Sequence, residues 1–304
     1  MTGALTARIF LLILVTAPIA LTGFSYNAAT ALAAVIVGLL GVIGLFKLPA
    51  VFLYAMTAFP IAGLVYLALL KREDETGVEW YPVGRVIMAA AIVSGGLFGL
   101  TVVPLASDEA AFQTSIRTAV ELAVKQGMAG LPPEAELKPE QLTQLTDILI
   151  IVLPAAGGAM VLFSLLGSLW LGAQVARAAG TLVRPWPDIA AFRFPAGAPI
   201  LLAISTLGAT WLEGPIQTLA LSFAGAFFGA YVLLGLAVAH FTSRGAFWRT
   251  PALVALYVIL IANPAVALLV AMLGVADSVF PFARAQRASP PDSPGGSAGR
   301  SGPP

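Results

Sequence analysis

Cysteine is absent from this chain of 304 residues, and histidine occurs only once. Without cysteine there can be no disulfide, thiolate metal site, iron–sulfur cluster or cysteine nucleophile. A single histidine, His240, cannot build a multi-histidine metal site, and no acidic residue lies near it in sequence to complete a Ser-His-Asp triad. We therefore expect no metal and no cofactor, and we expect His240 to serve at a helix end.

Charged residues are also scarce, at 10% of the chain, whereas a soluble domain carries ~25%. The net charge is +1, and the basic residues are scattered and not interleaved with aromatics, so nucleic acid is not an expected partner. The carboxylates Asp147, Glu213 and Asp277 fall at the ends of predicted spans, which argues against an ion pump or proton relay.

The sequence contains neither a Walker A motif nor a glycine-rich dinucleotide turn, so the chain is not expected to hydrolyse ATP itself. No acid–base or nucleophile constellation can be assembled from its residues either. An enzyme is therefore not expected.

What the chain does contain is long apolar runs: 59% of its residues are hydrophobic, and its mean hydropathy is +0.93. No charged residue stands between Asp147 and Arg177, and this run exceeds the ~20 residues that a helix needs to cross a bilayer. The pattern predicts an all-α, polytopic transmembrane bundle spanning residues 1–280. The eight hydrophobic helices are expected at about 9–24, 28–46, 49–70, 85–106, 148–174, 197–212, 215–240 and 251–275.

Three of these segments carry irregularities. Residues 1–24 have some features of a signal peptide, but a first membrane helix fits better because the apolar run continues beyond them. The segment at 197–212 is short and preceded by Pro195, so it either spans fully or is re-entrant. Pro264 lies inside the last segment and predicts a kink.

Lysine and arginine in short loops predict the orientation. The loops at 71–85, 175–196 and 241–250 each carry basic residues and are separated by even numbers of predicted helices. All three are therefore expected on one side, the cytoplasm. The loop at 107–146 then faces outward.

The 107–146 segment is the only sizeable polar insertion. Ser107-Asp108 is expected to cap a helix with apolar residues every four positions, Gly130 to Pro133 to break it, and Pro139 to begin a helix leading into the fifth span. We expect an amphipathic pair on the outer membrane surface or, alternatively, a lid over an outward-facing pocket. The tail at 281–304, rich in Ser, Pro and Gly, is expected to be disordered.

Few polar side chains occur within the spans. Of these, Ser168, Trp170, Gln174 and Asn263 are the candidates for a ligand pocket, since Trp170 and Gln174 share a helix face. Small residues at Gly95-x-x-x-Gly99 and Gly225-x-x-x-Gly229 predict close helix packing within the chain, or else a face for another membrane protein.

The most distinctive stretch follows the fifth span and contains Arg177 and Arg184-Pro185-Trp186-Pro187-Asp188. The two prolines around Trp186 predict an extended, rigid turn. Arg184 is suited to bonding helix-end carbonyls or a lipid phosphate. Arg177, Arg184 and Trp186 are therefore candidates for contact with lipid or a partner; the alternative is a purely structural connector.

This stretch resembles an uncharacterised bacterial membrane family, the YybS-like proteins. The likeness rests on the polar position near the end of the fifth helix, on Arg184 to Asp188, on Pro195, and on Trp80-Tyr81-Pro82; where the family usually has asparagine, this chain has Ser168. The family is similar to the S components of energy-coupling-factor vitamin transporters. The resemblance implies a location in the bacterial inner membrane.

The leading hypothesis is thus a non-enzymatic membrane protein that captures a small molecule for a transporter. The resemblance implies a membrane coupling subunit and ABC-type ATPases as partners, besides the lipid bilayer. The alternative is a membrane scaffold or assembly factor without a ligand.

Overall fold

The computed structural model describes residues 15–75, 77–127 and 139–280. The start of the first predicted helix, the break at 130–133 and the tail at 281–304 lie outside them. A helix over Val15–Ser25 precedes the labelled elements. These are α2 (Ala28–Leu45), α3 (Leu48–Leu69), β1 (Lys71–Asp74), β2 (Gly77–Trp80), α4 (Val83–Ala106), α5 (Glu109–Gly127), α6 (Pro139–Ala178), η2 (Ile189–Ala191), α7 (Ala198–Trp211), α8 (Gly214–Thr242), α9 (Arg249–Ala262) and α10 (Val266–Val279). The predicted all-α class is confirmed.

Among the described residues, five helices are long and apolar enough to cross a membrane: α2, α3, α4, α6 and α8. The outermost, α2, has a mean hydropathy of 2.4, yet only 11% of it is buried inside the protein. Apolar surface of that kind is stable only in contact with lipid or another apolar partner. The helices therefore form a membrane protein.

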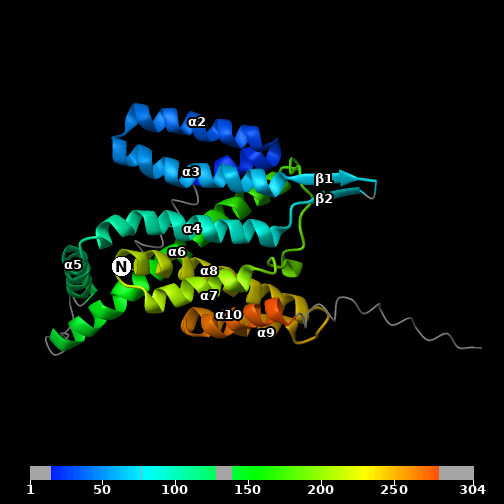
Figure 1. Cartoon of the computed structure of the whole chain (residues 1–304). Coiled ribbons are helices and arrows are strands. Elements are labelled where there is room, and N and C mark those ends of the chain that lie inside the picture. The colour runs from blue at the N-terminus through cyan, green and yellow to red at the C-terminus, as the bar shows by residue number, and fades with distance from the viewer. Residues whose placement is uncertain (1–14, 76, 128–138, 281–304) are drawn as a thin grey trace, which may run out of the picture.

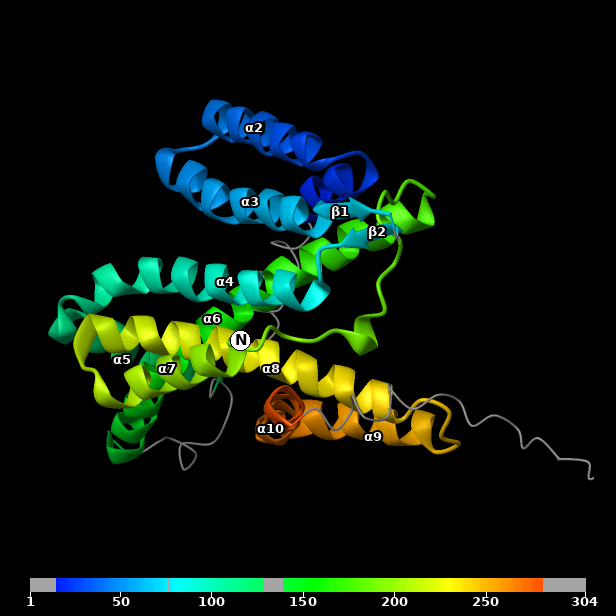
Figure 2. The same ribbon diagram turned by 45° about the vertical axis from the view of Figure 1, so that its right-hand side comes forward.

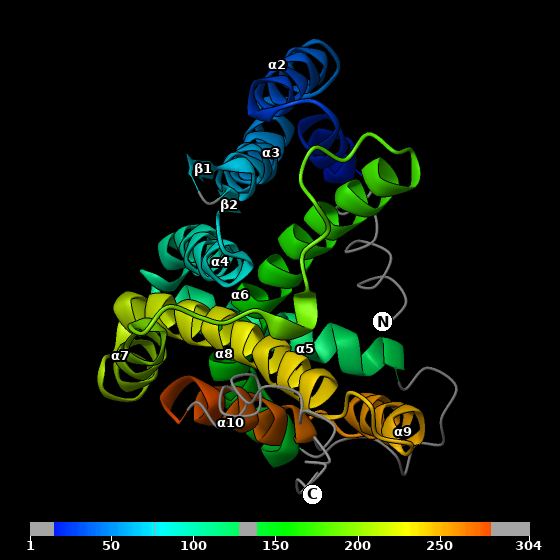
Figure 3. The ribbon, with the colours of Figure 1, turned by 90° about the vertical axis from the view of Figure 1, so that its right-hand side faces the viewer.

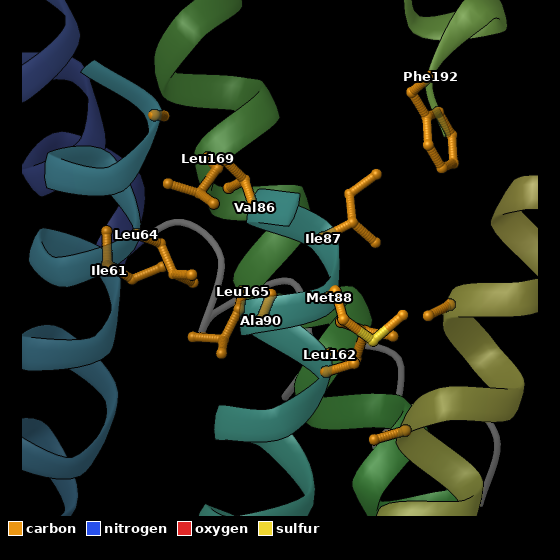
Figure 4. Close-up of a cluster of buried hydrophobic side chains, with 14 of the residues drawn as sticks. Ile61, Leu64, Val86, Ile87, Met88, Ala90, Leu162, Leu165, Leu169 and Phe192 are labelled. Carbon is orange, nitrogen blue, oxygen red and sulfur yellow. The ribbon is translucent and has the colours of Figure 1, made fainter. Parts of the chain in front are cut away.

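Helix α8 lies at the centre of the bundle and packs against α4, α6, α7 and α10 (Figures 1 and 2). The α2–α3 hairpin stands at the periphery. Ile61 and Leu64 of α3 join the core that α4 and α6 form (Figure 4). The helices thus share one apolar core, and α8 runs through its centre.

Glycines let these helices approach closely. A Cβ added at Gly95 or Gly99 of α4 would overlap Phe223 or Leu219 of α8, and one at Gly225 would overlap the Ala155 carbonyl of α6. Gly95-x-x-x-Gly99 and Gly225-x-x-x-Gly229 therefore serve packing within the chain, as the first of the two sequence interpretations has it.

The last hydrophobic segment is broken where the sequence predicted only a kink. Helix α9 ends at Ala262 and α10 begins at Val266. The Asn263 backbone is extended, and its side chain accepts a hydrogen bond from the Ala265 amide at 3.1 Å. Because Pro264 has no amide hydrogen to continue the ladder, the helix stops and restarts.

Helix α7 is also short. Its 14 residues rise about 21 Å at about 1.5 Å per residue, less than the ~30 Å of a hydrocarbon core. It runs antiparallel to α8, to which a tight turn joins it, and the Gln217 amide bonds the Ala209 carbonyl at 3.1 Å across that turn. Ala198, at the start of α7, is buried.

The loop predicted at 71–85 contains a β-hairpin that the sequence did not predict. Strands β1 and β2 pair antiparallel from Lys71 opposite Trp80 to Asp74 opposite Gly77. Gly77 has a φ of +135°, a conformation that only glycine adopts readily. Four-residue strands dominated by charge lack the apolar alternation by which strands are recognised.

The polar insertion begins as predicted. The Asp108 carboxylate accepts a hydrogen bond from the Ala111 amide at 3.0 Å and starts α5. Ile116 is buried while its neighbours on the other side of the helix are exposed, so α5 is amphipathic and packs against α4 and α6. Helix α6 begins at Pro139 and runs without interruption for 40 residues through the fifth span.

Candidate functional site

The segment between α6 and α7, residues 179–197, is called the connector below. Gly180, with a φ of +71°, ends α6. The Thr181 amide bonds the Ala176 carbonyl at 2.9 Å, and the Gly180 amide bonds the Arg177 carbonyl at 3.1 Å. This is a Schellman motif, which requires a left-handed residue just beyond the helix. It turns the chain back across the end of the bundle (Figure 3).

The connector is tied to three neighbouring elements. The Val183 amide donates to the Phe24 carbonyl at 2.9 Å, and the Arg184 guanidinium donates from Nη1 to the Ala68 carbonyl, the end of α3, at 2.7 Å. At Gly84 in the first turn of α4, an added Cβ would overlap the Arg193 carbonyl. These contacts hold the predicted 71–85 and 175–196 loops at one end of the bundle.

A fourth tie joins the connector to the α8–α9 loop. The Arg244 guanidinium binds the Asp188 carboxylate with two hydrogen bonds, of 2.9 and 2.5 Å. The Arg244 hydrogen bond lowers the pKa of the Asp188 carboxyl below its ordinary value. The third basic loop, 241–250, therefore lies at the same end as the other two, as its charges predicted.

Replacing Arg244 with glutamine is expected to lower the melting temperature at neutral pH by about 1–3 °C, because an exposed ion pair contributes about 0.2–1 kcal/mol. Since the pKa of Asp188 is lowered in the folded protein, the contribution is present above the unfolded value of about 3.9 and is lost as the pH falls through the folded value. Thermal melts of both proteins from pH 7 to about pH 3 should converge at the acid end. A constant gap would contradict the assignment.

Beneath the connector lies a cavity of about 520 Å³. Its wall is almost entirely apolar and draws on α4, α6, α8 and α9 as well as on the connector. Four of the residues that line it, Val86, Ile87, Leu169 and Phe192, are labelled in Figure 4. A volume of this size falls in the range of about 300–1,000 Å³ that is typical of small-molecule sites.

Two side chains that can carry positive charge line this cavity, and no carboxylate does. Arg184 is half-buried, and burial lowers the pKa of its guanidinium, although arginine stays charged in proteins. His240, in the last turn of α8, has its Nδ1 at 2.9 Å from the Leu236 carbonyl and its ring 5.8 Å from that of Tyr257. The cavity therefore suits an apolar molecule with one acceptor or anionic group.

Three residues singled out in the sequence meet at this cavity: Trp170, Arg184 and Trp186 all line it. Arg177 does not line it, but its guanidinium lies 4.7 Å from the centre of the Trp186 ring. This cation–π contact holds Trp186 against the end of α6. Of the residues predicted for lipid or partner contact, Arg184 and Trp186 thus form part of the cavity wall, while Arg177 contacts Trp186 from outside it.

The other three ligand candidates lie elsewhere. Ser168 is buried, shares a hydrogen bond of 2.7 Å with Thr16, and donates to the Ser164 carbonyl at 2.8 Å. Gln174 and Asn263 do not line the cavity either; Asn263 is exposed in the α9–α10 break. On α6, Trp170 and Ala173 line the cavity, whereas Gln174 does not.

His240, Tyr257 and Phe24 also line the cavity, although their sequence pattern did not predict a site. They come from three different helices, the one over Val15–Ser25, α8 and α9, and nothing in their local sequence indicates a shared wall. None of the described side chains of α5 lines this cavity, so no described residue of α5 covers it as a lid would. No group of three or more metal-ligating side chains occurs among residues 15–75, 77–127 and 139–280.

Comparison with known proteins adds a family. No curated protein and no solved structure matches the chain. A family described as "Predicted membrane protein (DUF2232)" matches residues 6–278, which is nearly the whole chain. That extent includes every helix and strand of the described bundle except the last residue of α10, Val279. The chain therefore belongs to the DUF2232 family of predicted membrane proteins.

Proposed function

We propose that this protein captures an apolar small molecule in the cavity under the connector, as the substrate-binding subunit of a transporter. The cavity itself carries the proposal, because its volume of about 520 Å³ and its apolar wall with few polar groups are those of small-molecule sites. A membrane coupling subunit and ABC-type ATPases in the bacterial inner membrane would supply the energy. The connector end would face the cytoplasm, where those ATPases lie.

The chemistry of the ligand follows from the wall. Trp170, Trp186 and Tyr257 offer flat aromatic surface, and most of the remaining lining is aliphatic. Arg184 is the one permanent charge at the cavity. We therefore infer an amphiphile or a mainly apolar molecule that carries a carboxylate, a phosphate or a carbonyl oxygen toward Arg184.

Binding without chemistry is the interpretation that the lining supports. Catalysis by acid and base needs paired groups with suitable protonation states near the reacting atoms. The cavity offers Arg184, His240 and Tyr257 but no carboxylate and no serine or threonine. His240 also has one ring nitrogen at hydrogen-bond distance from the Leu236 carbonyl.

The separate ATPase is inferred from two considerations. The sequence has no nucleotide motif, so the chain needs an external source of energy if it transports. The likeness to YybS-like proteins, and through them to the S components of energy-coupling-factor transporters, suggests the same division of labour. That likeness is one of pattern and fold class, and it does not by itself fix the function.

The rival function is a membrane scaffold or assembly factor. Its support is the α2–α3 hairpin, which exposes large apolar side chains such as Phe46, Leu48 and Phe52. Lipid covers such a face equally well, so the hairpin fits both functions. The two differ in whether a small molecule or a protein remains bound after gentle extraction.

Native mass spectrometry of the protein extracted from its own membranes tests the proposal. The wild-type protein is expected to retain a small-molecule adduct. Ala173→Phe fills the cavity and should remove that adduct, whereas Gln174→Leu, the next residue on α6, should retain it because Gln174 does not line the cavity. Leu236→Trp, at a lining residue of α8, repeats the test with a second filling variant.

A bare wild-type chain, or an adduct that survives both filling variants, would contradict capture in this cavity. Co-purification of proteins unrelated to transport, without any small molecule, would favour the scaffold. Co-purification of a membrane subunit with ATPases would support the transporter assignment separately from the ligand.

A further inference from the structure

The cavity under the connector is not closed on every side. Of the large apolar side chains that line it, three are exposed: Trp170 of α6 at 53%, Ile189 of the connector at 41% and Tyr257 of α9 at 40%. In contrast, Val86 and Ile87 of α4 line it and are buried. A side chain that lines a cavity and is also exposed borders its opening. Trp170, Ile189 and Tyr257 therefore mark an opening, called the side opening below.

Helix α9 borders the cavity without sealing it. Figures 2 and 3 show the C-terminal half of α8 between α6 and α9. Helix α9 has no buried residue and packs mainly on α10. Its Tyr257 ring lies 5.8 Å from the ring of His240 on α8, and both residues line the cavity. The described part of the bundle thus leaves the cavity accessible between α6 and α9.

The side opening lies at the depth of lipid chains. Trp170 precedes Arg177 by seven residues, Tyr257 follows Arg249 by eight, and no charged residue lies in either interval. At about 1.5 Å per residue, the two aromatic residues are about 10–12 Å along their helices from these arginines. Arginines near the ends of membrane helices reach the level of the headgroups. Trp170 and Tyr257 therefore face acyl chains and not water.

Arg184 stands at the other level of the same cavity. It lines the cavity from the connector, and its Nη1 donates to the Ala68 carbonyl, at the end of α3, at 2.7 Å. The guanidinium thus lies at a helix end, where headgroups are found, while the apolar wall extends to the depth of the chains. A membrane lipid in its normal orientation has the same arrangement, with its phosphate at the surface and its chains below. Such a lipid can enter sideways without turning over or leaving the bilayer.

The connector covers the cavity on its aqueous side. Residues 185–187 line the cavity, and the contact of Arg177 with the Trp186 ring at 4.7 Å fixes this stretch. The ion pair of Arg244 with Asp188 fixes the residue that follows. A ligand from water would have to displace these contacts, whereas a ligand from the bilayer meets the side opening directly.

We propose that the cavity receives its ligand from the bilayer: an anionic membrane lipid enters through the side opening, places one chain in the cavity and brings its phosphate to Arg184. The cavity volume of about 520 Å³ is that of sites for drug-sized molecules, so the cavity holds one chain and not a whole lipid with two. The inference rests on the function proposed for the cavity and names the substrate class.

Photo-crosslinking in lipid nanodiscs tests this entry. The probe is phosphatidylglycerol with a diazirine near the end of one chain, because two chains keep the probe in the bilayer. In wild type, illumination should attach the chain to buried wall residues such as Ile87 and Ala237, which mass spectrometry of the peptides locates. Val37 on α2, which is exposed and lies outside the cavity wall, should be labelled in every variant.

Two variants and a second probe separate the contributions. Ala173→Phe fills the cavity and should abolish the cross-links at Ile87 while those at Val37 remain. Val254→Phe introduces the same side chain at an exposed position of α9 outside the cavity wall and should keep the cross-links at Ile87. A diacylglycerol with the same diazirine chain has no phosphate and should label Ile87 more weakly than phosphatidylglycerol does.

The outcomes distinguish this inference from the function on which it rests. Cross-links confined to exposed residues, together with a water-soluble adduct in native mass spectrometry that Ala173→Phe removes, would overturn lipid entry and leave capture in the cavity standing. Absence of both cavity cross-links and adduct would overturn both. Equal labelling of Ile87 by the two probes would contradict the contact between phosphate and Arg184.

Discussion

Replacing Gly225 with leucine is expected to disrupt the bundle more than any other single substitution considered for this protein. A Cβ at Gly225 would overlap the Ala155 carbonyl of α6, and a Cβ at Gly158 would overlap the Ser222 carbonyl of α8. The two glycines therefore form a reciprocal contact of backbone against backbone. No side chain can rotate out of the way, so a leucine must separate α6 from α8.

Overpacking a core costs about 1–3 kcal/mol when side chains can adjust, and the separation of two backbones lies at or beyond the upper end. We expect Gly225→Leu to lower the melting temperature by about 10 °C or more, or to abolish the monodisperse peak in size-exclusion chromatography. Helix association in lipid depends on this close packing, since no hydrophobic force replaces it.

Gly41→Leu is the matched control. Gly41 lies on α2, where an added Cβ meets no atom within 4 Å, and leucine is the better helix former. This variant should behave like wild type in detergent. If both variants behaved alike, the assignment of α6 and α8 as a backbone contact would be wrong.

The spans were predictable because bilayer length and apolar composition leave few alternatives. The ends of α8 and of the α2–α3 hairpin lie within a few residues of their predicted positions. Basic residues also predicted that three loops share one end. This agreement follows from two rules, the length of the apolar segments and the number of basic residues in the loops. Neither rule depends on which helices pack against one another.

The break between α9 and α10 was not predictable from Pro264 alone. A proline inside a membrane helix produces either a kink or a stop, depending on what satisfies the backbone around it. Here the Asn263 side chain binds the Ala265 amide at 3.1 Å and stabilises the stop. The sequence contains Asn263 next to Pro264, but their local hydrogen bonding is a property of the folded chain.

The cavity was predictable only in part. Trp170, Arg184 and Trp186 were identified because they lie in or beside one unusual stretch of sequence. His240 and Tyr257 reach the same wall from α8 and α9, and only the tertiary packing brings them there. Asp277 lies near the end of α10, as the sequence predicted, yet it is buried. Its burial was not predictable, because it depends on the packing of α10 against α8.

Arg184→Met is expected to abolish the preference of the cavity for an acidic ligand. Nη1 of Arg184 donates to the Ala68 carbonyl at 2.7 Å, and this is its one hydrogen bond among the described residues. The remaining N–H groups of the guanidinium are available to a bound acceptor, and a hydrogen bond to a charged group is worth about 1.5–3 kcal/mol. That corresponds to a loss of about 10- to 100-fold in affinity.

A matched pair of fluorescent probes isolates this contribution: a fatty acid and the fatty alcohol of the same chain length. Wild type in nanodiscs should bind the acid more tightly, and Arg184→Met should bind the two alike while it still binds the alcohol. Arg249→Met removes a charge at the start of α9, outside the cavity wall, and should leave the preference intact.

Arg184→Met is expected to weaken binding of the acidic ligand and to lower the stability of the protein only slightly. In Arg184→Met the Ala68 carbonyl at the end of α3 loses its donor. This carbonyl lies close enough to the end of the bundle for water to replace the donor. Arg184→Lys keeps the charge but not the planar fork, so an intermediate preference indicates that geometry contributes beside charge. Equal preference in wild type and Arg184→Met, with both proteins folded, would mean that Arg184 only fastens the connector to α3 and that the ligand carries no anionic group toward it.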